Sequence, residues 1–435
     1  MMPPARVLYT LLGAALLPWL PLRLWWRGQR EPGYRAHIGE RFGRYGGSER
    51  SSLGAPLFWL HAVSVGETRA AAPLVRRLRQ DYPLASILMT HMTATGRETG
   101  RALYGDQVLQ AWLPYDLPFA VRAFYAHFRP AAGFLIETEL WPNLIAEART
   151  RGVPVYLVNA RLSERSARAY GRFSSITRPM LAALAGVAAQ SQADASRLAA
   201  LGAPQAVVTG NLKFDVNVPP ESLELAEGLR ISFGVGRRVW VAGSTRDREE
   251  ALILDALARK PLPRGVLTVI VPRHPQRFAA VAELLRARAI PFKRRSDRHS
   301  AVSDDTAVVL GDSMGEMLAY YAAADVAFVG GSLLPLGGQN LIEPLAVGTP
   351  VLVGPHTFNF MEAAAGAIEA GAAQRVRDAD ALVAALAELL GNEVHRNAMS
   401  RAARSFHAMH AGAADRLWEW LAPRLPPRDA PVVNR

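Results

Sequence analysis

The chain of 435 residues, half of them hydrophobic and a fifth charged, is too apolar to be disordered and fits two domains of about 200 residues. It contains no cysteine, which excludes disulfides, thiolate catalysis and cysteine metal sites. Its net charge of +12 favours anionic partners such as acidic lipid, a phosphorylated sugar or a nucleotide, but no recognition-helix, zinc or RNA-binding signature supports a nucleic acid.

An uncharged apolar run from Val7 to Leu22 predicts a membrane anchor within residues 1–30. The run has about 16 residues, fewer than the ~20 of a comfortable bilayer span. Residues typical of a membrane interface and of its cytoplasmic side accompany it: Trp19, Arg23, Trp25, Trp26, Arg27 and Arg30. We expect an uncleaved anchor that either spans with its N-terminus outside or lies in the inner leaflet. A signal peptide and a buried core helix are the alternatives.

Short apolar strands and amphipathic helices alternate between a Gly/Ser-rich linker at Gly46–Ala55 and the residue Lys213. The strands are expected to end near Val63, His91, Leu113, Glu137, Asn159, Gln190 and Gly210. Such alternation is typical of a parallel, doubly wound sheet. The residues from Val216 to Glu221, with two prolines, are expected to link this half to the next.

A second alternating set runs from Val239 to about Leu390, with strand ends expected near Ala242, Val271, Leu310, Val329 and Val353. Two Rossmann-like halves facing a cleft form the α/β architecture of the GT-B glycosyltransferases. The predicted division is an anchor (1–30), an acceptor-binding domain (31–215), a nucleotide-sugar domain (216–422) and a tail (423–435). Neither half opens with G-x-G-x-x-G or a Walker A motif, which argues against a dinucleotide dehydrogenase and a P-loop ATPase.

The stretch from Leu60 to Thr68, LHAVSVGET, places Glu67 where an expected strand opens into a helix. Ligands bind at such carboxyl ends in open α/β sheets, so Glu67 is a candidate catalytic carboxylate. The same residues fit a capping box, in which Ser64 and Glu67 hydrogen-bond each other's backbone N–H. The local sequence leaves both interpretations open.

A second acidic strand end, IETELWPN, carries Glu137 and Glu139, which would lie near Glu67 if their strands are neighbours. One carboxylate would then serve as a base while another tunes its pKa. The alternative is that both are exposed acids in the first turn of the next helix. Lys213, in GNLKFD, is expected at the cleft floor to stabilise a leaving phosphate, or else to be a surface lysine packed on Phe214.

Four strand ends of the second half are marked by glycine or proline: AGSTRDREE, VPRHPQR, GDSMGEM and GGSLLPLGGQNLIEP. Each offers backbone N–H groups or an arginine at a helix start, which holds phosphate without a metal. Arg273 and His274 supply cationic or donor groups, and Glu343 is placed to accept from ribose hydroxyls. The D-x-D motif that starts at Asp378 is expected to be a helix N-cap and no metal site.

In combination these motifs resemble the 3-deoxy-D-manno-octulosonic acid (Kdo) transferase family of lipopolysaccharide assembly, from about residue 8 to 410. The stretches that carry the resemblance are RLWWRG, YRAHIGERFG, HAVSVGET, LPYDLP, ETELWPN, NARLS, GNLKFD, VPRHP, MGEM, GGQN and GPHTFNF. Many members have GGHNPLE where this chain has GGQNLIE. Gln339 and Leu341 are therefore departures, whereas Asn340 and Glu343 are kept.

The resemblance implies CMP-Kdo as donor, the lipid A precursor as acceptor, and a place at the cytoplasmic face of the inner membrane. It implies metal-independent inverting transfer without a cofactor, in which Glu67 is the general base and Glu137 and Lys213 stabilise the transition state. The donor-binding residues that it implies are Pro272, Arg273, Met314, Gly315, Glu316, Asn340, Leu341, Ile342 and Glu343.

Two other functions remain to be distinguished. A GT-B-shaped nucleotide-sugar epimerase would need no lipid acceptor, so it would leave the N-terminal apolar run unexplained. A membrane-anchored basic protein that binds nucleic acid or acidic lipid would bind many polyanions in a salt-dependent way and would give Glu67 no role.

Overall fold

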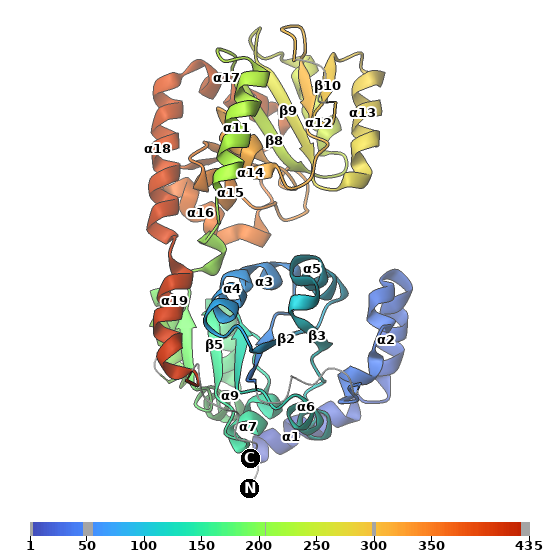
Figure 1. Cartoon of the computed structure of the whole chain (residues 1–435), viewed down its shortest axis with the longest axis vertical. Coiled ribbons are helices and arrows are strands. Elements are labelled where there is room, and N and C mark those ends of the chain that lie inside the picture. Colours follow the sequence, from blue (N-terminus) through green and yellow to red (C-terminus); the bar gives the residue numbers. More distant parts are fainter. Residues whose placement is uncertain (1–2, 47–54, 205, 298–301, 428–435) are drawn as a thin grey trace. The chain divides into compact units, whose positions relative to one another are not determined.

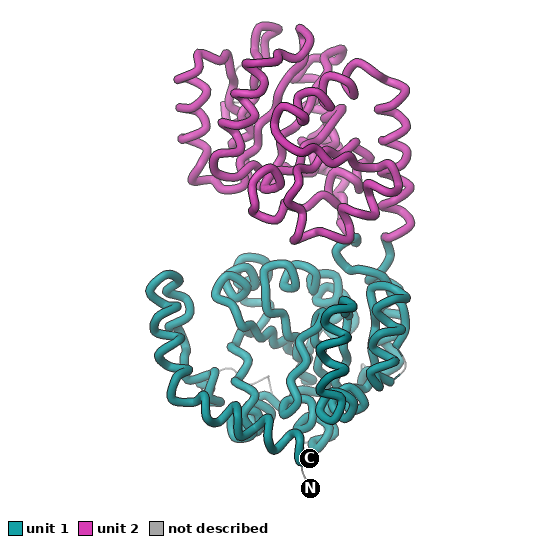
Figure 2. The backbone as a smooth tube through the Cα atoms, turned by 180° about the vertical axis from the view of Figure 1, so that it is seen from behind, with its two compact units in different colours: residues 1–215, 411–435 teal, residues 216–410 magenta. Residues whose placement is uncertain are grey.

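Strands and helices alternate along the computed structural model, which describes residues 3–46, 55–204, 206–297 and 302–427 (Figure 1). They form two units: unit 1 comprises residues 1–215 and 411–435, and unit 2 comprises residues 216–410 (Figure 2). Most of the predicted Gly46–Ala55 linker (47–54) and the end of the predicted tail (428–435) lie outside the described residues.

Unit 1 is built on a parallel sheet with the strand order β3-β2-β1-β4-β5-β6-β7. The strands are β1 (Leu57–His61), β2 (Ser86–His91), β3 (Leu109–Trp112), β4 (Ala132–Ile136), β5 (Val155–Ala160), β6 (Gly186–Ala189) and β7 (Ala206–Val208). β1 is buried along its whole length because Trp59 packs into the core on one face and Phe58 into the core on the other. Burial on both faces explains why the central strands are continuous apolar runs in the sequence.

Helices cover both faces of this sheet. One core packs under α6 (Pro118–Phe128), α7 (Pro142–Thr150), α9 (Ser174–Leu181) and α10 (Gln192–Ala200), and the other under α3 (Val65–Ala70), α4 (Ala72–Asp81), α5 (Ala94–Tyr104) and α19 (Ala413–Leu421). Unit 1 also contains α8 (Glu164–Arg172) and the short 3-10 turns η1 (Pro32–Arg35), η2 (Ile38–Phe42), η3 (Gly105–Gln107), η4 (Leu212–Phe214) and η7 (Ala422–Arg424). Several helices begin directly after a strand at a hydroxyl that accepts the N–H three residues on: Ser64, Thr93 and Ser191.

Unit 2 follows the same plan, with the parallel strand order β10-β11-β9-β8-β12-β13-β14. The strands are β8 (Val239–Thr245), β9 (Leu267–Pro272), β10 (Phe292–Arg294), β11 (Val308–Leu310), β12 (Val326–Val329), β13 (Val351–Val353) and β14 (Ala373–Arg375). One core lies against α11 (Pro220–Phe233) and α14 (Met317–Ala322), and the other against α12 (Glu249–Arg259), α13 (Phe278–Ala287), α17 (Ala379–Gly391) and α18 (Glu393–His410). The remaining helical segments are η5 (Pro275–Arg277), α15 (Ile342–Ala346), η6 (Phe358–Phe360) and α16 (Met361–Glu369).

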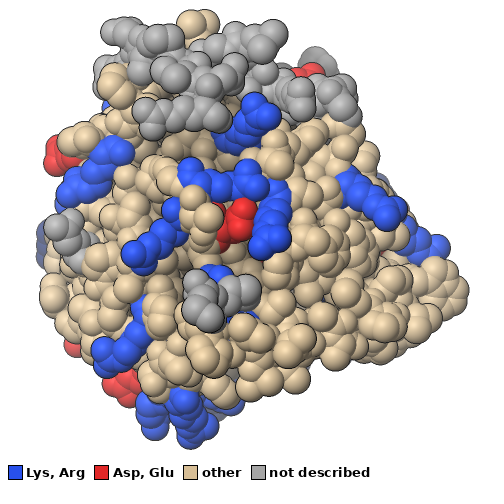
Figure 3. Space-filling model, turned by 90° about the horizontal axis from the view of Figure 1, so that it is seen from below, with Lys and Arg blue, Asp and Glu red and all other residues tan. Residues whose placement is uncertain are grey.

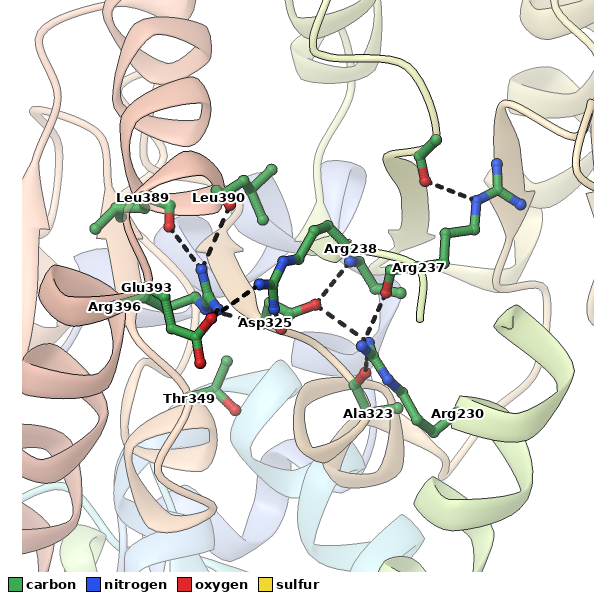
Figure 4. A network of polar contacts seen from close by, with 12 residues as sticks. Arg230, Arg237, Arg238, Ala323, Asp325, Thr349, Leu389, Leu390, Glu393 and Arg396 are labelled. Atoms are coloured by element: carbon green, nitrogen blue, oxygen red, sulfur yellow. Dashed lines mark hydrogen bonds and ion pairs between the residues drawn. The ribbon is translucent and has the colours of Figure 1, made fainter. Parts of the chain in front are cut away.

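A charged network fixes the amino ends of the unit 2 strands around Asp325, which directly precedes β12 (Figure 4). Its Oδ2 accepts from the N–H of Val239 at 2.8 Å and from Arg230 at 3.2 Å. Its Oδ1 lies 3.5 Å from Arg238 and 3.8 Å from Arg396, so one carboxylate ties α11, β8 and α18 together. The opposite edge, where the strands end, is the edge that carries the predicted donor residues.

The last helix, α19, belongs to unit 1. The Asp215 carboxylate caps its start by accepting from the N–H groups of Gly412 at 2.6 Å and Ala413 at 3.2 Å, and Leu417 and Leu421 complete one core of unit 1. The expected domain of residues 216–422 therefore ends earlier in the structure, at His410. The physical reason is this cap together with the apolar face of α19.

The N-terminal apolar run forms α1 (Pro4–Ala15) and α2 (Trp19–Arg30), which are broken by a 57° bend. In the part of the chain that the structure describes, no single helix has the length and apolarity to cross a membrane, whereas this bent pair taken together meets the length and composition that a span needs.

The sequence analysis predicted two Rossmann-like sheets from the alternation of strands and helices. The parallel sheets of unit 1 and unit 2 confirm this prediction.

Candidate active site

The predicted catalytic residues of unit 1 follow two neighbouring strands. β1 pairs with β4 in parallel, with His61 opposite Leu135, so the condition under which Glu137 was expected to lie near Glu67 is met. Glu67 lies in the first turn of α3 just beyond β1, and Glu137 comes directly after β4. α3 also lies next to η4, which carries Lys213.

The carboxylate of Glu67 lies over its own turn. Ser64 accepts from the backbone N–H of Glu67 at 3.4 Å and donates its hydroxyl to Oε1 at 2.9 Å, and the N–H of Val63 donates to Oε2 at 2.6 Å. The interactions of a capping box are therefore present, with Val63 in place of Ser64 as the backbone donor. The catalytic role of Glu67 stays a prediction.

Glu67 is nevertheless an unusual cap. The pKa of Glu67 is raised from 4.5 to about 7, chiefly by burial and also by the charges of Glu137 and Glu139, while the hydrogen bonds from the Val63 N–H and the Ser64 hydroxyl act in the opposite direction. A capping carboxylate with no other task would be expected to stay ionised beside a helix N-terminus. A carboxyl group that titrates near neutral pH instead matches the requirement for a general base.

Glu137 and Lys213 form a partly buried ion pair. Lys213 Nζ donates to Glu137 Oε1 at 2.7 Å, and the two side chains are 17% and 22% exposed. The alternatives of an exposed first-turn acid and a surface lysine are wrong for this pair, because α7 begins only at Pro142 and the two charges face each other. The pKa of Glu139 is raised, mainly by burial and also by Glu137.

The backbone around this pair is held in a costly conformation. Glu137 has a φ of 64°, which is uncommon for a residue other than glycine and costs on the order of 1 kcal/mol. Its N–H donates to the Val158 carbonyl at 3.0 Å, which holds the turn in place. Strain of this kind is concentrated at functional sites in proteins.

Asn159 is a site residue that sequence reasoning did not single out, although it lies in the NARLS motif. It is fully buried, has a φ of 52°, and its Oδ1 accepts from the N–H of Leu212 at 3.0 Å. One residue further on, the N–H of Lys213 donates to Asn211 Oδ1 at 3.0 Å. The two asparagines thus fix the turn that carries Lys213.

The predicted donor residues of unit 2 lie at the carboxyl ends of β9, β11 and β12. Pro272 ends β9, and the N–H of Arg273 donates to the Thr245 carbonyl at 2.9 Å, which joins the ends of β8 and β9. The Nε of Arg273 donates to Gln339 Oε1 at 3.2 Å, so the departure at Gln339 places an amide acceptor on a predicted phosphate ligand. The pKa of His274 is lowered, first by burial and then by neighbouring arginines.

The loop after β11 exposes Met314, turns at Gly315 with a φ of 81°, and presents Glu316. Glu316 accepts from Arg295 Nε at 3.1 Å and from the Ser313 hydroxyl at 2.6 Å. The loop therefore offers backbone groups and an exposed apolar side chain, while its carboxylate is held by a cation.

The loop after β12 ends in α15. Asn340 Oδ1 accepts from the N–H of Ile342, and its Nδ2 donates to Glu343 Oε1, both at 3.0 Å. The side chains of Leu341 and Ile342 are buried in the core, so these two predicted donor residues are limited to backbone contacts with a ligand.

The D-x-D motif caps a helix, as predicted: Asp378 Oδ1 accepts from the N–H of Ala381 at 2.7 Å at the start of α17. Among the described residues no three histidine or acidic side chains are grouped so as to hold a metal ion.

The chain is similar to known proteins of one family. The family model described as 3-deoxy-D-manno-octulosonic-acid transferase (kdotransferase) matches residues 36–216, and that of glycosyl transferases group 1 matches residues 294–406. A 3-deoxy-D-manno-octulosonic acid transferase of Bordetella pertussis is 46% identical over 432 residues, covering 96% of this chain and 99% of the relative. The chain belongs to the Kdo transferase family.

A second Kdo transferase, from Haemophilus influenzae, is 41% identical and covers 91% of this chain and 93% of the relative. The chain is thus a glycosyltransferase, and the family prediction is confirmed. A UDP-GlcNAc 2-epimerase from Neisseria meningitidis bound to UDP-GlcNAc is similar in structure, with a TM-score of 0.55, 14% identity, and coverage of 84% of this chain and 100% of that chain. At that identity the likeness shows the GT-B-like fold alone, so the epimerase alternative gains no support from it.

Proposed function

We propose that this Kdo transferase moves a Kdo residue from CMP-Kdo to the lipid A precursor with inversion and without a metal. The observation that carries the proposal is the group formed by Glu67, Glu137 and Lys213 at one edge of the unit 1 sheet. A carboxyl group with a pKa of about 7 stands there beside a lysine ion pair that is held on a strained turn.

Glu67 acts as the base. Its two oxygens accept from Val63 and Ser64 and still have lone pairs for one further donor, since an ionised carboxylate offers about four acceptor positions. The acceptor hydroxyl donates to this carboxylate, its oxygen bonds to the anomeric carbon of Kdo, and its proton passes to Glu67. The bond from the anomeric carbon to the phosphate breaks, and CMP leaves with the electron pair.

Glu137 and Lys213 stabilise the charges that develop in this step. The Glu137 carboxylate favours the oxocarbenium-like sugar, and the ammonium of Lys213 retains N–H donors for the departing phosphate. Because both side chains are largely shielded from water, their fields act more strongly there than at an exposed position.

Unit 2 holds the donor at its strand ends. Arg273 contacts the phosphate, Glu343 accepts from the ribose hydroxyls, and the loop from Met314 to Glu316 contacts the nucleoside. CMP carries one phosphate, so cationic side chains and backbone N–H groups supply the charge that a divalent ion provides for many diphosphate donors.

Activity is tested with the purified full chain, CMP-Kdo and lipid A precursor in detergent. CMP should be released in proportion to the acceptor consumed. The rate of this release should not change when a chelator is added, and it should fall at least ~10²-fold in Glu67→Gln. Glu164→Gln is the matched control, because Glu164 also lies in the first turn of a helix after a serine cap but is 76% exposed. CMP release that does not depend on acceptor would refute the proposed reaction.

We also propose that the α1–α2 pair holds the enzyme in the inner leaflet at the cytoplasmic face of the inner membrane. Apolar and aromatic side chains on the pair face solvent: Leu8, Leu11, Leu12, Leu16, Trp19, Leu22, Trp25 and Trp26. Arg23 and Arg30 stack on Trp19 and Trp26 at 5.7 and 5.4 Å, where they would meet anionic headgroups. Figure 3 shows Lys and Arg side chains spread over a face on which acidic side chains are sparse.

Contacts between α1 and the rest of unit 1 favour the in-leaflet alternative over a span. The Thr10 hydroxyl accepts from Asn143 Nδ2 at 3.0 Å, and Tyr9 hydrogen-bonds Asp116. Asp116 in turn accepts from the N–H groups of Asn143 and Leu144 at the start of α7. A helix tied in this way to the sheet domain would have to break these partly buried polar contacts in order to enter a bilayer alone.

A further inference from the structure

Four basic side chains gather where β8 and β9 of unit 2 end: Arg246, Arg273, His274 and Arg277. The three arginines are close enough to lower the pKa of His274 in addition to the effect of its burial. Such a concentration of positive charge at the carboxyl edge of a sheet indicates an anionic ligand.

Two of these arginines are already engaged. Arg277 donates to Glu250 at 2.9 Å and pairs with Asp247, and Glu250 is fully buried, so this arginine joins η5 to α12. Arg273 is held through its Nε by Gln339, as described above. Both guanidinium groups therefore have fixed places.

Arg246 differs from them. In the described part of the chain no hydrogen bond or ion pair joins its half-buried guanidinium to an acceptor, and the charged side chains beside it in the cluster are the arginines Arg273 and Arg277. Its aliphatic stem lies over Gly331, where a Cβ would come within 3.4 Å of Arg246 Cγ and 3.0 Å of Gln339 Nε2. The glycine thus leaves room for Arg246 and Gln339 to approach the same loop.

The backbone under Arg246 is rigid. Glu249 is fully buried, and its Oε2 accepts from the N–H of Arg246 at 2.9 Å and from that of Gly331 at 2.5 Å. Its Oε1 accepts from the N–H of Leu333 at 3.0 Å. The Glu249 carboxylate therefore fixes the turn after β8 against the glycine loop after β12. The unpaired guanidinium of Arg246 thus extends from a turn whose backbone is held in place.

The proposed donor carries two anions on one carbon, because the anomeric carbon of an ulosonic acid bears both the phosphate oxygen and a carboxylate. Two arginines beside the same His274 match this arrangement, and a planar guanidinium binds a carboxylate through two parallel hydrogen bonds. We propose that Arg246 binds the carboxylate of the ulosonic acid in the donor, while Arg273 binds the phosphate. This inference rests on the proposed function and makes Arg246 the residue that selects an acidic sugar nucleotide.

The test compares two ligands that differ by the sugar. The affinities of the full-length protein for CMP-Kdo and for CMP are measured by calorimetry without acceptor. Arg246→Met should weaken CMP-Kdo binding about 10- to 100-fold, the usual scale for a hydrogen-bonded charge pair, and should leave CMP binding within about twofold of wild type. Arg273→Met should weaken both ligands. Arg259→Met, at the other end of α12 and 59% exposed, is the matched control and should change neither.

A chemical change in the donor provides an independent measurement. A CMP-Kdo analogue whose carboxylate is converted to a neutral amide should bind wild type about as weakly as CMP-Kdo binds Arg246→Met, and should bind both proteins alike. Retained CMP binding shows in the same experiment that the variant is folded.

Three results would overturn the inference. Unchanged CMP-Kdo binding by Arg246→Met would remove any role for the side chain, and equal weakening of CMP and CMP-Kdo would assign Arg246 to the phosphate. Failure of the wild type to bind CMP-Kdo while it binds CMP would refute the proposed donor as well. The first two leave the proposed function intact, provided that wild type still releases CMP with acceptor.

Discussion

Replacing Glu67 with glutamine should make unit 1 more stable at pH 8, even though it removes the proposed base. Burial raises the pKa of Glu67 from 4.5 to about 7, so ionisation is less favourable in the folded than in the unfolded chain. One pKa unit corresponds to about 1.4 kcal/mol, and this shift therefore costs the folded state on the order of 3 kcal/mol once the carboxylate is ionised.

The sign of the pH dependence follows from this shift. Below about pH 4.5 the carboxyl group is protonated in both states and the penalty is absent. Between pH 4.5 and 7 the unfolded chain loses this proton while the folded chain keeps it, so the wild type loses stability as the pH rises. Glutamine has no charge at any pH, and its amide oxygen still accepts from the Val63 N–H.

Urea unfolding of wild type and Glu67→Gln at pH 5, 6, 7 and 8 measures the effect. Tryptophan fluorescence suits the assay, because eight of the nine tryptophans belong to unit 1. The difference in the free energy of unfolding should be small at pH 5 and should approach the order of 3 kcal/mol in favour of glutamine at pH 8. Glu164→Gln should show no such trend. A Glu67→Gln variant that is less stable than wild type at every pH would refute the reasoning and leave Glu67 as a helix cap.

Three other substitutions test the remaining parts of the site and the anchor. Lys213→Ala should lower kcat roughly 10²- to 10³-fold, because it removes a donor to the departing phosphate. In the double variant with Glu137→Ala, the loss of kcat should be smaller than the product of the two single losses, and independent effects would contradict the ion pair. Asn159→Ala leaves the Leu212 N–H unpaired, so it should lower the free energy of urea unfolding by about 1–3 kcal/mol and should also lower kcat. A normal kcat would show that Asn159 does not position Lys213. Trp25→Glu with Trp26→Glu should prevent flotation with anionic vesicles without changing kcat on detergent-dispersed acceptor, and unchanged flotation would contradict the anchor.

The central strands could be predicted because burial on both faces produces uninterrupted apolar runs. The edge strands β10 and β14 escaped prediction, because each has three residues and includes exposed or half-exposed Lys, Arg or Gln that are typical of loops. The return of α19 to unit 1 was also missed. It depends on the cap that Asp215 forms, a contact between residues about 200 positions apart that no local pattern contains.

The part of the candidate site that could be predicted is the placement of its residues at the carboxyl ends of strands. The sequence analysis placed Glu67 and Glu137 at strand ends but left open whether their strands are neighbours, and the pairing of β1 with β4 answers this question. The ion pair with Lys213 could not be derived, because hydrophobic periodicity places a residue on an element and says nothing of which side chains meet. Asn159 was overlooked for the same reason, although asparagine is among the residues that adopt a positive φ most readily.

Because α19 completes a core of unit 1, unit 2 is an insertion within that unit. A contiguous piece, residues 216–410, could therefore be excised or replaced, and the severed ends could be rejoined between Asp215 and Ala411. Expression of residues 1–215 alone would instead leave an apolar groove uncovered and invite aggregation. Cleavage by a protease near Pro219 would not release either fragment under native conditions, because α19 would still be packed against residues 1–215.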